Sequence, residues 1–331
     1  MYMEGNVSQS PAIDEIVALG TVDVVIPTYQ PDEKFEQLLV RLHKQTVKPR
    51  HIYIINTEEN FFRSEEAKKY EDITITHISK YEFDHGGTRN QGASMSDADF
   101  ILFITQDAVP KNKHLVEKLL GAFQDEQVAA AYARQLGDAK KDYMEHYTRV
   151  FNYPPESRKK TIEDLNELGI KTFFCSNVCA MYRRSLFEDV GGFACHAIFN
   201  EDMMMAAELV QGGYAIYYAA DAKVTHWHSY TGLQQLKRNF DVAVSQQQAG
   251  ELFTKVKSEK EGIRLVVRTC GHMLKHGKFY LIPKVIWISG FKFIGFQLGK
   301  RYRKLPKSWI RKLSLNPDFW TSYWDRQMAA L

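Results

Sequence analysis

Asp107 follows the apolar run FILFIT (residues 100–105) after a single glutamine. A carboxylate oxygen at such a position suits Mg²⁺ or Mn²⁺, whose coordination substrate phosphates and water would complete. A lone aspartate ahead of a proline also forms turns, so this residue alone does not decide between a metal ligand and a turn former.

The segment HGGTRN (residues 85–90) contains the groups that a phosphate site needs. Its glycines allow the backbone to approach a ligand closely, and Arg89 offers donors to phosphate oxygens. The alternative is a surface arginine beside a flexible turn. The motif GxGxxG does not occur in the sequence, which disfavours a Rossmann dinucleotide site.

Glu201 and Asp202 open the helical pattern NEDMMMAAEL, with Asn200 at the cap position. Acidic residues in the first turn stabilise the positive end of the helix dipole, and that structural role alone would explain them. In the functional interpretation, the same dipole keeps a carboxylate ionised and ready to accept a proton from a hydroxyl group. The sequence leaves both roles open.

His226 and His228 follow a predicted strand, two residues apart. If the strand continues, the two imidazoles point to opposite sides, so a shared chelate is disfavoured and we expect one metal ligand and one bystander. Trp227 and Tyr230 could form a stacking surface for a sugar ring, although aromatic residues of this kind are commonly part of a core.

These residues need a scaffold, and the sequence predicts an α/β domain. Short β-branched or apolar runs at residues 21–29, 51–56, 72–78 and 100–105 alternate with helical patterns, which indicates a mostly parallel sheet. Ligands bind at the carboxyl ends of the strands in such sheets. We expect a polar, mobile stretch over residues 138–171 and a helix that opens after the glycines of HGGTRN.

Charge divides the chain into two parts. Residues 1–262 carry 29 Lys and Arg against 38 Asp and Glu, a net charge of −9, whereas residues 263–317 carry 13 Lys and Arg and no acidic residue. This asymmetry favours an anionic partner for the basic part. The four cysteines show no CxxC spacing, which predicts reduced thiols in a cytosolic protein. Residues 1–20 read as a flexible leader without the features of a secretory signal.

The basic part contains a twenty-residue apolar run at residues 279–298. Its length would span a bilayer, but Lys284 and Lys292 argue against spanning. On a helix, these lysines fall within an arc of about 100° together with Gly295 and Arg303. We therefore expect a helix that lies at a membrane interface. A helical subdomain or a homodimer contact is the alternative, and nucleic acid is disfavoured because the basic residues are mixed with large aliphatic ones.

Five motifs, in order between residues 22 and 248, resemble the family 2 glycosyltransferases and, within them, the bacterial rhamnosyltransferases. The motifs are VVIPTY, FDHGGTRNQGA, FILFITQDAVP, GGF followed by NEDMMMAAEL, and VTHWHSYTGLQQLKR. The resemblance implies a GT-A fold with a mixed, mostly parallel sheet and a basic helical C-terminal appendage. The expected division is a leader at 1–20, a catalytic domain at 21–245 and a helical region at 246–331 that associates with membranes or forms oligomers.

The resemblance also implies a role for each matching residue. Asp202 would be the catalytic base, with Glu201 beside it to orient the acceptor. Asp107 and His226 would hold the metal, with His228 as the alternative to His226. The acceptor or the sugar would contact Trp227, Tyr230 and Arg238. The nucleotide sugar would contact Pro27, Thr28, Tyr29, Asn56, Gly86, Arg89, Asn90, Gln106 and Asp107.

The sequence departs from the family pattern at three places. Thr105 stands where the first aspartate of the DxD motif is usual, and Asn56-Thr57 replaces a frequent Asp-Asp pair. Asn239 replaces the tryptophan of QxxRW, which favours the addition of one or a few sugars over long-chain synthesis.

The expected activity is an inverting transfer of L-rhamnose from dTDP-L-rhamnose to a lipid-linked saccharide in the synthesis of a bacterial surface polysaccharide. It would use Mg²⁺ or Mn²⁺ in the cytoplasm, at the inner face of the plasma membrane. Two alternatives remain: a transferase of the same fold that uses a UDP-sugar, and a non-catalytic protein on a degenerate scaffold that binds membranes or polysaccharides.

Overall fold

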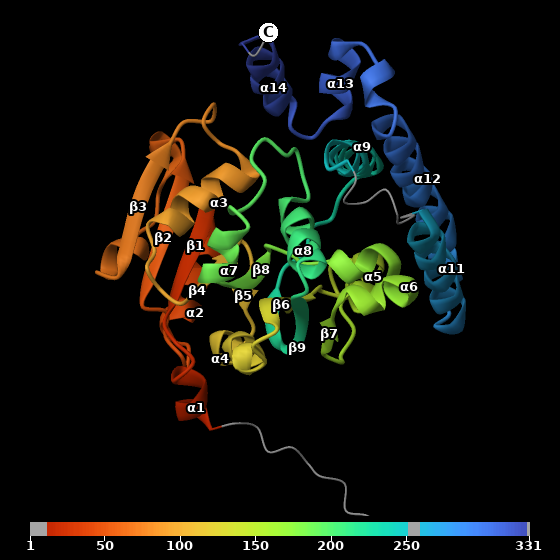
Figure 1. Cartoon of the computed structure of the whole chain (residues 1–331). Coiled ribbons are helices and arrows are strands. Elements are labelled where there is room, and N and C mark those ends of the chain that lie inside the picture. The colour runs from red at the N-terminus through yellow and green to blue at the C-terminus, as the bar shows by residue number, and fades with distance from the viewer. Residues whose placement is uncertain (1–11, 251–258, 330–331) are drawn as a thin grey trace, which may run out of the picture.

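The computed structural model describes residues 12–250 and 259–329, and its centre is a nine-stranded sheet (Figure 1). The strand order is β3-β2-β1-β4-β8-β6-β9-β5, and β7 pairs with β9. The strands are β1 (Val22–Tyr29), β2 (His51–Thr57), β3 (Ile73–Ile78), β4 (Phe100–Ile104), β5 (Val109–Pro110), β6 (Val128–Leu136), β7 (Arg158–Lys160), β8 (Cys179–Arg183) and β9 (Ala215–Thr225).

Strands β3, β2, β1 and β4 are parallel, and so are β6 and β9. Strand β8 joins these two groups by antiparallel pairing with β4 and β6, and β5 and β7 pair antiparallel with β9. The expected mixed, mostly parallel sheet is confirmed. Its consequence for function is that β1, β2 and β4 end at one edge, with Asp107 just beyond β4.

Helices cover both faces of the sheet. Apolar side chains of α2 (Glu33–His43) and α4 (Leu115–Leu120) fill the core on one face. The other face is covered by α7 (Arg184–Asp189) and α8 (Glu201–Gln211), with Ala93 of α3 (His85–Ser94) in the same core. The short 3-10 helices lie at Glu59–Phe61, Ala67–Lys69, Gly121–Gln124, Ile162–Asp164, Gly169–Phe173, Phe279–Leu281 and Tyr302–Lys304.

Helix α3 begins before the glycines of HGGTRN, so the expectation that it opens after them is wrong. Asp84 is its N-cap residue and accepts a hydrogen bond from the backbone N–H of Gly87 (2.7 Å). Gly86 lies in the first turn, where a Cβ atom would overlap the backbone carbonyl oxygen of Ala194. This glycine therefore allows α3 to pack closely against the loop that precedes α8.

The stretch expected to be mobile, residues 138–171, contains regular structure instead. It forms α5 (Tyr143–Asn152), β7 and α6 (Leu165–Leu168). Asp142 caps α5 by accepting from two backbone N–H groups at 3.1 Å. The buried ammonium group of Lys160 donates to the carbonyl oxygens of Lys171 and Phe174. A polar composition concealed these tertiary hydrogen bonds, which hold the stretch on the sheet.

The C-terminal part is helical, as expected, and packs on α9 (Gly232–Gln248), a helix that crosses the expected domain boundary at residue 245. It comprises α11 (Glu259–Lys275), α12 (Ile282–Gly299), α13 (Lys307–Leu313) and α14 (Pro317–Ala329), which lie along the right side and top of the molecule in Figure 1. Buried side chains of α9, α13 and α14 form a separate small core.

The expected leader falls partly outside the described residues, which begin at residue 12. Within the described part, Ile13–Val17 forms the short helix α1. Ile16 is buried against the domain, so this segment is a packed element rather than a flexible one.

Candidate active site

Asp107, His226 and His228 form a cluster of possible metal ligands at the edge where β4 ends. Val109 of β5 pairs with Thr225 of β9, and this pairing brings the end of β9 beside Asp107. The ligating atoms of the three side chains lie within 4.8 Å of one another. Oδ2 of Asp107 lies 3.5 Å from Nε2 of His226 and 3.0 Å from Nε2 of His228.

The two imidazoles lie on the same side, so the expectation that they point apart is wrong. Strand β9 ends at Thr225, and the alternation of side chains in a strand does not extend to the two histidines. Their Nε2 atoms are 3.1 Å apart. His228 is therefore a member of the cluster together with His226, not a substitute for it.

Gln135, at the end of β6, orients the ring of His226. Its Nε2 donates to Oγ of Ser176 (3.0 Å), so its Oε1 is the atom that accepts from Nδ1 of His226 (3.0 Å). This assignment leaves a lone pair on Nε2 of His226, directed at a carboxylate oxygen. This lone pair and the carboxylate of Asp107 are both electron-pair donors aimed at one point, so the donor set fits a divalent metal ion.

The charges in the cluster agree with this role. Burial would raise the pKa of Asp107, but the hydrogen bond from His228 and the charges of both histidines outweigh it and hold this pKa far below its ordinary value. Burial lowers the pKa of His226 to about 3, against the opposing effect of Asp107. The cluster thus offers an ionised carboxylate and a neutral imidazole, the forms that bind metals.

Glu201 and Asp202 occupy the first turn of α8, directly after Asn200, whose backbone has a left-handed conformation (φ 65°). Asn200 does not cap the helix with its side chain; it donates to Oγ of Ser245 instead (2.6 Å). The carboxylate of Asp202 accepts from the backbone N–H groups of Asn177 (3.0 Å) and Met203 (2.8 Å). These bonds fix the direction of its remaining lone pairs.

The environment of Asp202 raises its pKa to about 7. Burial is the main cause and the charge of Glu201 the second, and together they exceed the two backbone hydrogen bonds, which lower it. The expectation that the helix dipole keeps this carboxylate fully ionised at neutral pH is therefore wrong. A base whose pKa lies near the working pH is well suited to accept a proton during a reaction.

Arg89 does not extend into open space but lies buried beside Glu201. One of its guanidinium nitrogens is 3.2 Å from Oε1 of Glu201 and donates to the carbonyl oxygen of His85 (2.8 Å). Burial would raise the pKa of Glu201, but the charges of Arg89 and His85 hold it below its ordinary value. Arg89 thus keeps the residue next to the candidate base ionised.

A short path of hydrogen bonds joins the metal cluster to the acidic pair. It runs from His226 to Gln135, from Gln135 to Ser176, and through the next peptide unit to the N–H of Asn177, which donates to Asp202. The side chain of Asn177 also donates to Glu201 (3.4 Å). Residues more than ninety positions apart in the sequence are thereby held in one neighbourhood.

The predicted nucleotide residues lie at the ends of β1, β2 and β4. Thr28 donates to Oδ1 of Asn56 (3.1 Å), and the amide of Gln106 bonds both backbone groups of Tyr29 at 2.8 and 3.0 Å. Asn56 is fully buried and also donates to the carbonyl oxygen of Glu58, so its amide is engaged by the protein. Pro27 is half-buried, whereas Tyr29 is exposed and meets Phe61 edge to face.

Asn90 has a structural position as well. Its amide donates to the carbonyl oxygen of Phe193 (2.8 Å) and accepts from the N–H of the same residue (2.9 Å). Together with Gly86, it fastens α3 to the loop that leads into α8. The HGGTRN motif thus supports the position of the acidic pair, a role that its composition did not reveal.

The three predicted acceptor contacts lie near the metal cluster and the start of α8. Trp227 is half-buried beneath the ammonium group of Lys141 (5.2 Å from the ring centre). The rings of Tyr230 and His228 are 5.5 Å apart. The guanidinium group of Arg238 lies 4.8 Å from the ring centre of Phe199, next to Asn200.

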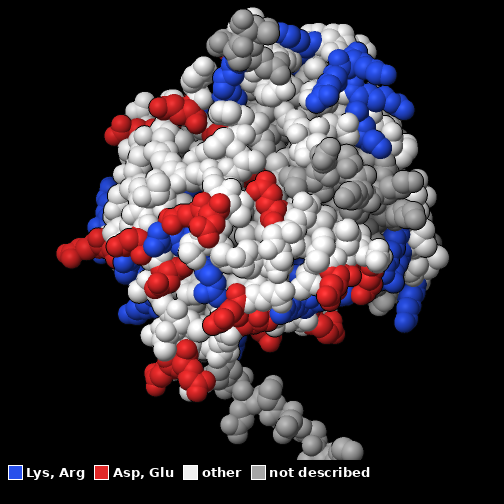
Figure 2. Space-filling model, in the orientation of Figure 1, with Lys and Arg blue, Asp and Glu red and all other residues white. Residues whose placement is uncertain are grey.

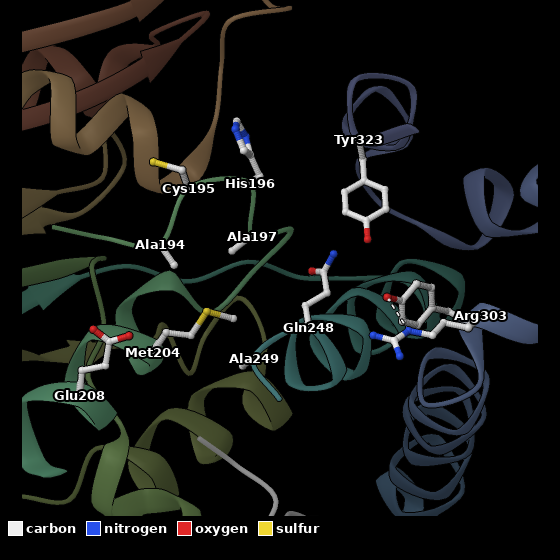
Figure 3. A pocket seen from close by; sticks show the side chains of 11 residues that line it. Ala194, Cys195, His196, Ala197, Met204, Glu208, Gln248, Ala249, Arg303 and Tyr323 are labelled. Atoms are coloured by element: carbon white, nitrogen blue, oxygen red, sulfur yellow. Dashed lines mark hydrogen bonds between the residues drawn. The ribbon is translucent and has the colours of Figure 1, made fainter. Parts of the chain in front are cut away.

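A separate cavity of about 370 Å³ lies between α8, the end of α9 and the C-terminal helices. Met204 and Glu208 line it from α8, and Figure 3 shows His196 on one side of it and Gln248, Arg303 and Tyr323 on the other. Nothing in the sequence indicated this cavity, because it forms between the catalytic domain and the C-terminal helices.

Gln135, Ser176 and Asn177 were missed by sequence reasoning. Gln135 does carry a signal, since it is an amide at the end of the apolar run AAAYARQL, the same kind of position that drew attention to Asp107. Ser176 and Asn177 carry none, because their contribution comes from a hydroxyl group and a backbone N–H at a turn before β8.

Comparison with known proteins agrees with this geometry. The family model described as Glycosyl transferase family 2 matches residues 23–191. The chain is 38% identical to the O-antigen chain rhamnosyltransferase WbaN of Salmonella anatum, over 90% of this chain and 95% of that protein. It is 35% identical to the O-antigen chain rhamnosyltransferase RfbN of Salmonella typhimurium, over 91% and 96%.

Among solved structures, the fold is similar to that of the mannosyltransferase PcManGT from Pyrobaculum calidifontis, in complex with GDP-Man and Mn²⁺. The TM-score is 0.52, with 14% identity over 92% of this chain and 85% of that one. At this level of identity the likeness concerns the fold alone, and it confirms the expected GT-A architecture. With the family match over half of the chain and the two relatives aligned over nearly their whole length, the protein is a glycosyltransferase that belongs to glycosyl transferase family 2.

Proposed function

We propose that the protein transfers L-rhamnose from dTDP-L-rhamnose to a lipid-linked saccharide, with inversion at the anomeric carbon. The observation that carries this proposal is the similarity, over nearly their full length, to two proteins named O-antigen chain rhamnosyltransferases. The arrangement of a metal cluster and a carboxylate of raised pKa in one neighbourhood supports the chemistry.

In this proposal Asp202 is the general base. The acceptor hydroxyl oxygen attacks the anomeric carbon, the bond from that carbon to the phosphate oxygen breaks, and dTDP departs. Asp202 takes the hydroxyl proton as the new glycosidic bond forms. General-base assistance of this kind contributes roughly 10²–10⁴-fold to the rate. Glu201 and Arg89 position this base and set its charge, since they lie beside it as a buried pair.

Asp107, His226 and His228 would hold the divalent ion, which supplies positive charge to the departing diphosphate. Two imidazoles with one carboxylate form a donor set that suits Mn²⁺ better than Mg²⁺, which prefers oxygen ligands. We therefore propose Mn²⁺ as the preferred ion. The mannosyltransferase PcManGT, which shares the fold, was solved in complex with GDP-Man and Mn²⁺, and this supports the choice.

The acceptor in this proposal is a saccharide carried on a lipid, because both rhamnosyltransferase relatives are named for the O-antigen chain. We place the enzyme in the cytoplasm, as a peripheral protein on the inner face of the plasma membrane. The basic composition of residues 263–317 supports that location.

The test is a transfer assay with the purified full-length chain, Mn²⁺ and a synthetic lipid-linked saccharide. We expect turnover with dTDP-L-rhamnose, loss of turnover with EDTA, and a product whose anomeric configuration, measured by NMR, is opposite to that of the donor. Turnover only with a UDP-sugar would replace the donor in this proposal. Binding of saccharide without turnover of any donor would identify a non-catalytic protein.

A further inference from the structure

Helix α12 presents its apolar side to the outside of the molecule. Its outward residues include Ile286, Trp287, Phe293 and Ile294, whose exposed fractions are 59%, 66%, 61% and 51%. Large aliphatic and aromatic side chains at these levels of exposure are unusual when they recur on one helix face in a soluble protein. Here they do recur, since Phe293 and Ile294 lie two helical turns beyond Ile286 and Trp287.

The opposite side of α12 is made of small and buried residues and faces α9. A Cβ atom at Gly295 or Gly299 would overlap the backbone carbonyl oxygen of Leu236 or Phe240, so the two helices touch backbone to backbone. The spacing Gly-x-x-x-Gly is typical of helices that pack in membranes. Lys292 lies on this protein-facing side, where burial lowers its pKa.

The helix is therefore the reverse of an ordinary surface helix, whose apolar side faces the protein and whose polar side faces water. The sequence indicated a polar arc and an apolar remainder, and the structure shows which of them the protein covers. It covers the part of the arc that contains Lys292 and Gly295, and it leaves Lys284 and most of the apolar remainder exposed.

The exposed apolar surface extends beyond α12. Phe279 and Tyr280, just before the helix, are exposed, and so are Ile263, Val267 and Leu274 along α11. We call the exposed side chains from Ile263 to Ile294 the apolar face: Ile263, Val267, Leu274, Phe279, Tyr280, Ile286, Trp287, Phe293 and Ile294.

Exposed basic residues follow the apolar face in the chain, and residues 263–317 contain no acidic residue. Arg301, Lys304, Arg311 and Lys312 are all exposed just beyond α12. Figure 2 shows Lys and Arg gathered at the upper right, where Figure 1 places the end of α12 and α13, while acidic residues lie over the lower and left parts. An apolar surface bordered by positive charge complements a bilayer that contains anionic lipids.

Residues Phe279–Gly299 form one helical stretch that is long and apolar enough to cross a membrane by length and composition. In the structure it packs lengthwise on α9, which carries Gln234, Gln235, Lys237 and Asn239. A crossing orientation would either break this contact or carry these polar groups into hydrocarbon. A helix that lies in the plane of the interface keeps both α9 and its contact with α12 in place.

We propose that the apolar face binds an anionic phospholipid surface, with α12 parallel to the bilayer. A second copy of the chain is the other candidate for covering this face. It is disfavoured because pairing two such faces would bring together two segments of 13 basic and no acidic residues each. This inference deepens the peripheral location given under the proposed function, but it does not depend on the donor sugar and can be tested without any sugar nucleotide.

The test is co-sedimentation of the full-length protein with vesicles of phosphatidylcholine alone or with phosphatidylglycerol added. We expect binding to the mixed vesicles, at least tenfold weaker binding to pure phosphatidylcholine, and progressive release by salt. The double variant W287E/F293E should lose at least tenfold in binding to the mixed vesicles. Val17→Glu is the matched control, since it places the same charge on an exposed apolar residue of the distant helix α1 and should bind as the original protein does.

A second variant tests the charge separately. Changing Arg301, Lys304, Arg311 and Lys312 to glutamine should weaken binding to the mixed vesicles and flatten its dependence on salt, with the apolar face intact. Light scattering of the protein in solution tests whether a second copy of the chain covers the apolar face. If the original protein is a dimer that W287E/F293E converts to a monomer, and neither protein binds vesicles, the proposal is overturned. Equal binding of W287E/F293E and Val17→Glu would overturn it as well.

Discussion

Asp107 and Asp202 are the same amino acid in the same neighbourhood, yet their surroundings shift their pKa values in opposite directions. Both carboxyl groups are largely enclosed, and burial favours the neutral form of each. Asp107 faces two imidazoles, and its pKa falls far below the ordinary value. Asp202 faces Glu201, and its pKa rises to about 7.

The contrast indicates a division of labour. A carboxylate that stays ionised at every physiological pH can hold a metal ion but is a weak proton acceptor. A carboxylate with a pKa near 7 can take up a proton during the reaction and release it afterwards. Opposite shifts in neighbouring carboxyl groups are a general way to separate such roles. Each of the following changes would test one side of this comparison.

The largest effect is expected for Asp202→Asn. Removal of the base should lower kcat by roughly 10²–10⁴-fold and leave donor binding unchanged, because Asp202 is not among the residues that we propose to contact the donor. Transfer rate and donor affinity, the latter by calorimetry, provide the measurements. Glu208→Gln, on the same helix, is the matched control and should retain the rate. Retention of more than a tenth of the original rate in Asp202→Asn would exclude Asp202 as the base.

The next largest effect concerns the metal side. Asp107→Asn and His228→Gln should each weaken Mn²⁺ binding by about 100-fold or more, because changes outside the ligand set alone cost roughly 10–100-fold. Titration of Mn²⁺ by electron paramagnetic resonance measures this directly and needs no turnover. Unchanged Mn²⁺ affinity in His228→Gln would show that His228 is not a metal ligand.

Gln135→Leu should have a smaller effect on the same quantity. The leucine cannot accept from Nδ1 of His226, so the imidazole loses the bond that holds its tautomer and orientation. We expect Mn²⁺ affinity to fall by about tenfold, at the lower end of the range for residues that support a ligand. Gln106→Leu serves as a comparison, because Gln106 bonds the backbone of Tyr29 and no ligand.

The smallest effect is a displacement of the pH profile. The rate should rise with pH as Asp202 loses its proton, with an apparent pKa of about 7. Glu201→Gln removes the negative charge beside Asp202 and so favours its ionised form. The rising part of the pH–rate profile should then move to lower pH by about one unit. A profile that stays in place would show that Glu201 does not set the charge of the base.

The sequence was sufficient to predict the sheet, the acidic pair on α8 and the position of Asp107. Each depends on a local pattern: an apolar run bounded by polar residues, or acids that open a helical repeat. The same patterns did not predict the order inside residues 138–171, since the hydrogen bonds of Asp142 and Lys160 are not visible in a polar composition.

The roles of single side chains were harder to predict, because they depend on contacts between distant segments. Arg89 forms a buried pair with Glu201, a partner that the sequence did not indicate. His226 and His228 were expected to diverge and instead converge on Asp107, because β9 ends at Thr225, before either of them. The raised pKa of Asp202 depends on enclosure by segments that the sequence does not place beside it.

The seam of Gly295 and Gly299 against α9 has a consequence for which acceptors the enzyme can reach. Neither glycine has a side chain to separate the two helix backbones, which are therefore in direct contact. This contact leaves α12 little freedom to slide or rotate on α9. Helix α9 begins at Gly232, shortly after His228, so a bilayer beneath α12 would fix the height of the metal cluster above the lipid. An anchor of that kind selects saccharides by how far their growing end projects from the membrane, in addition to the sugar that they present.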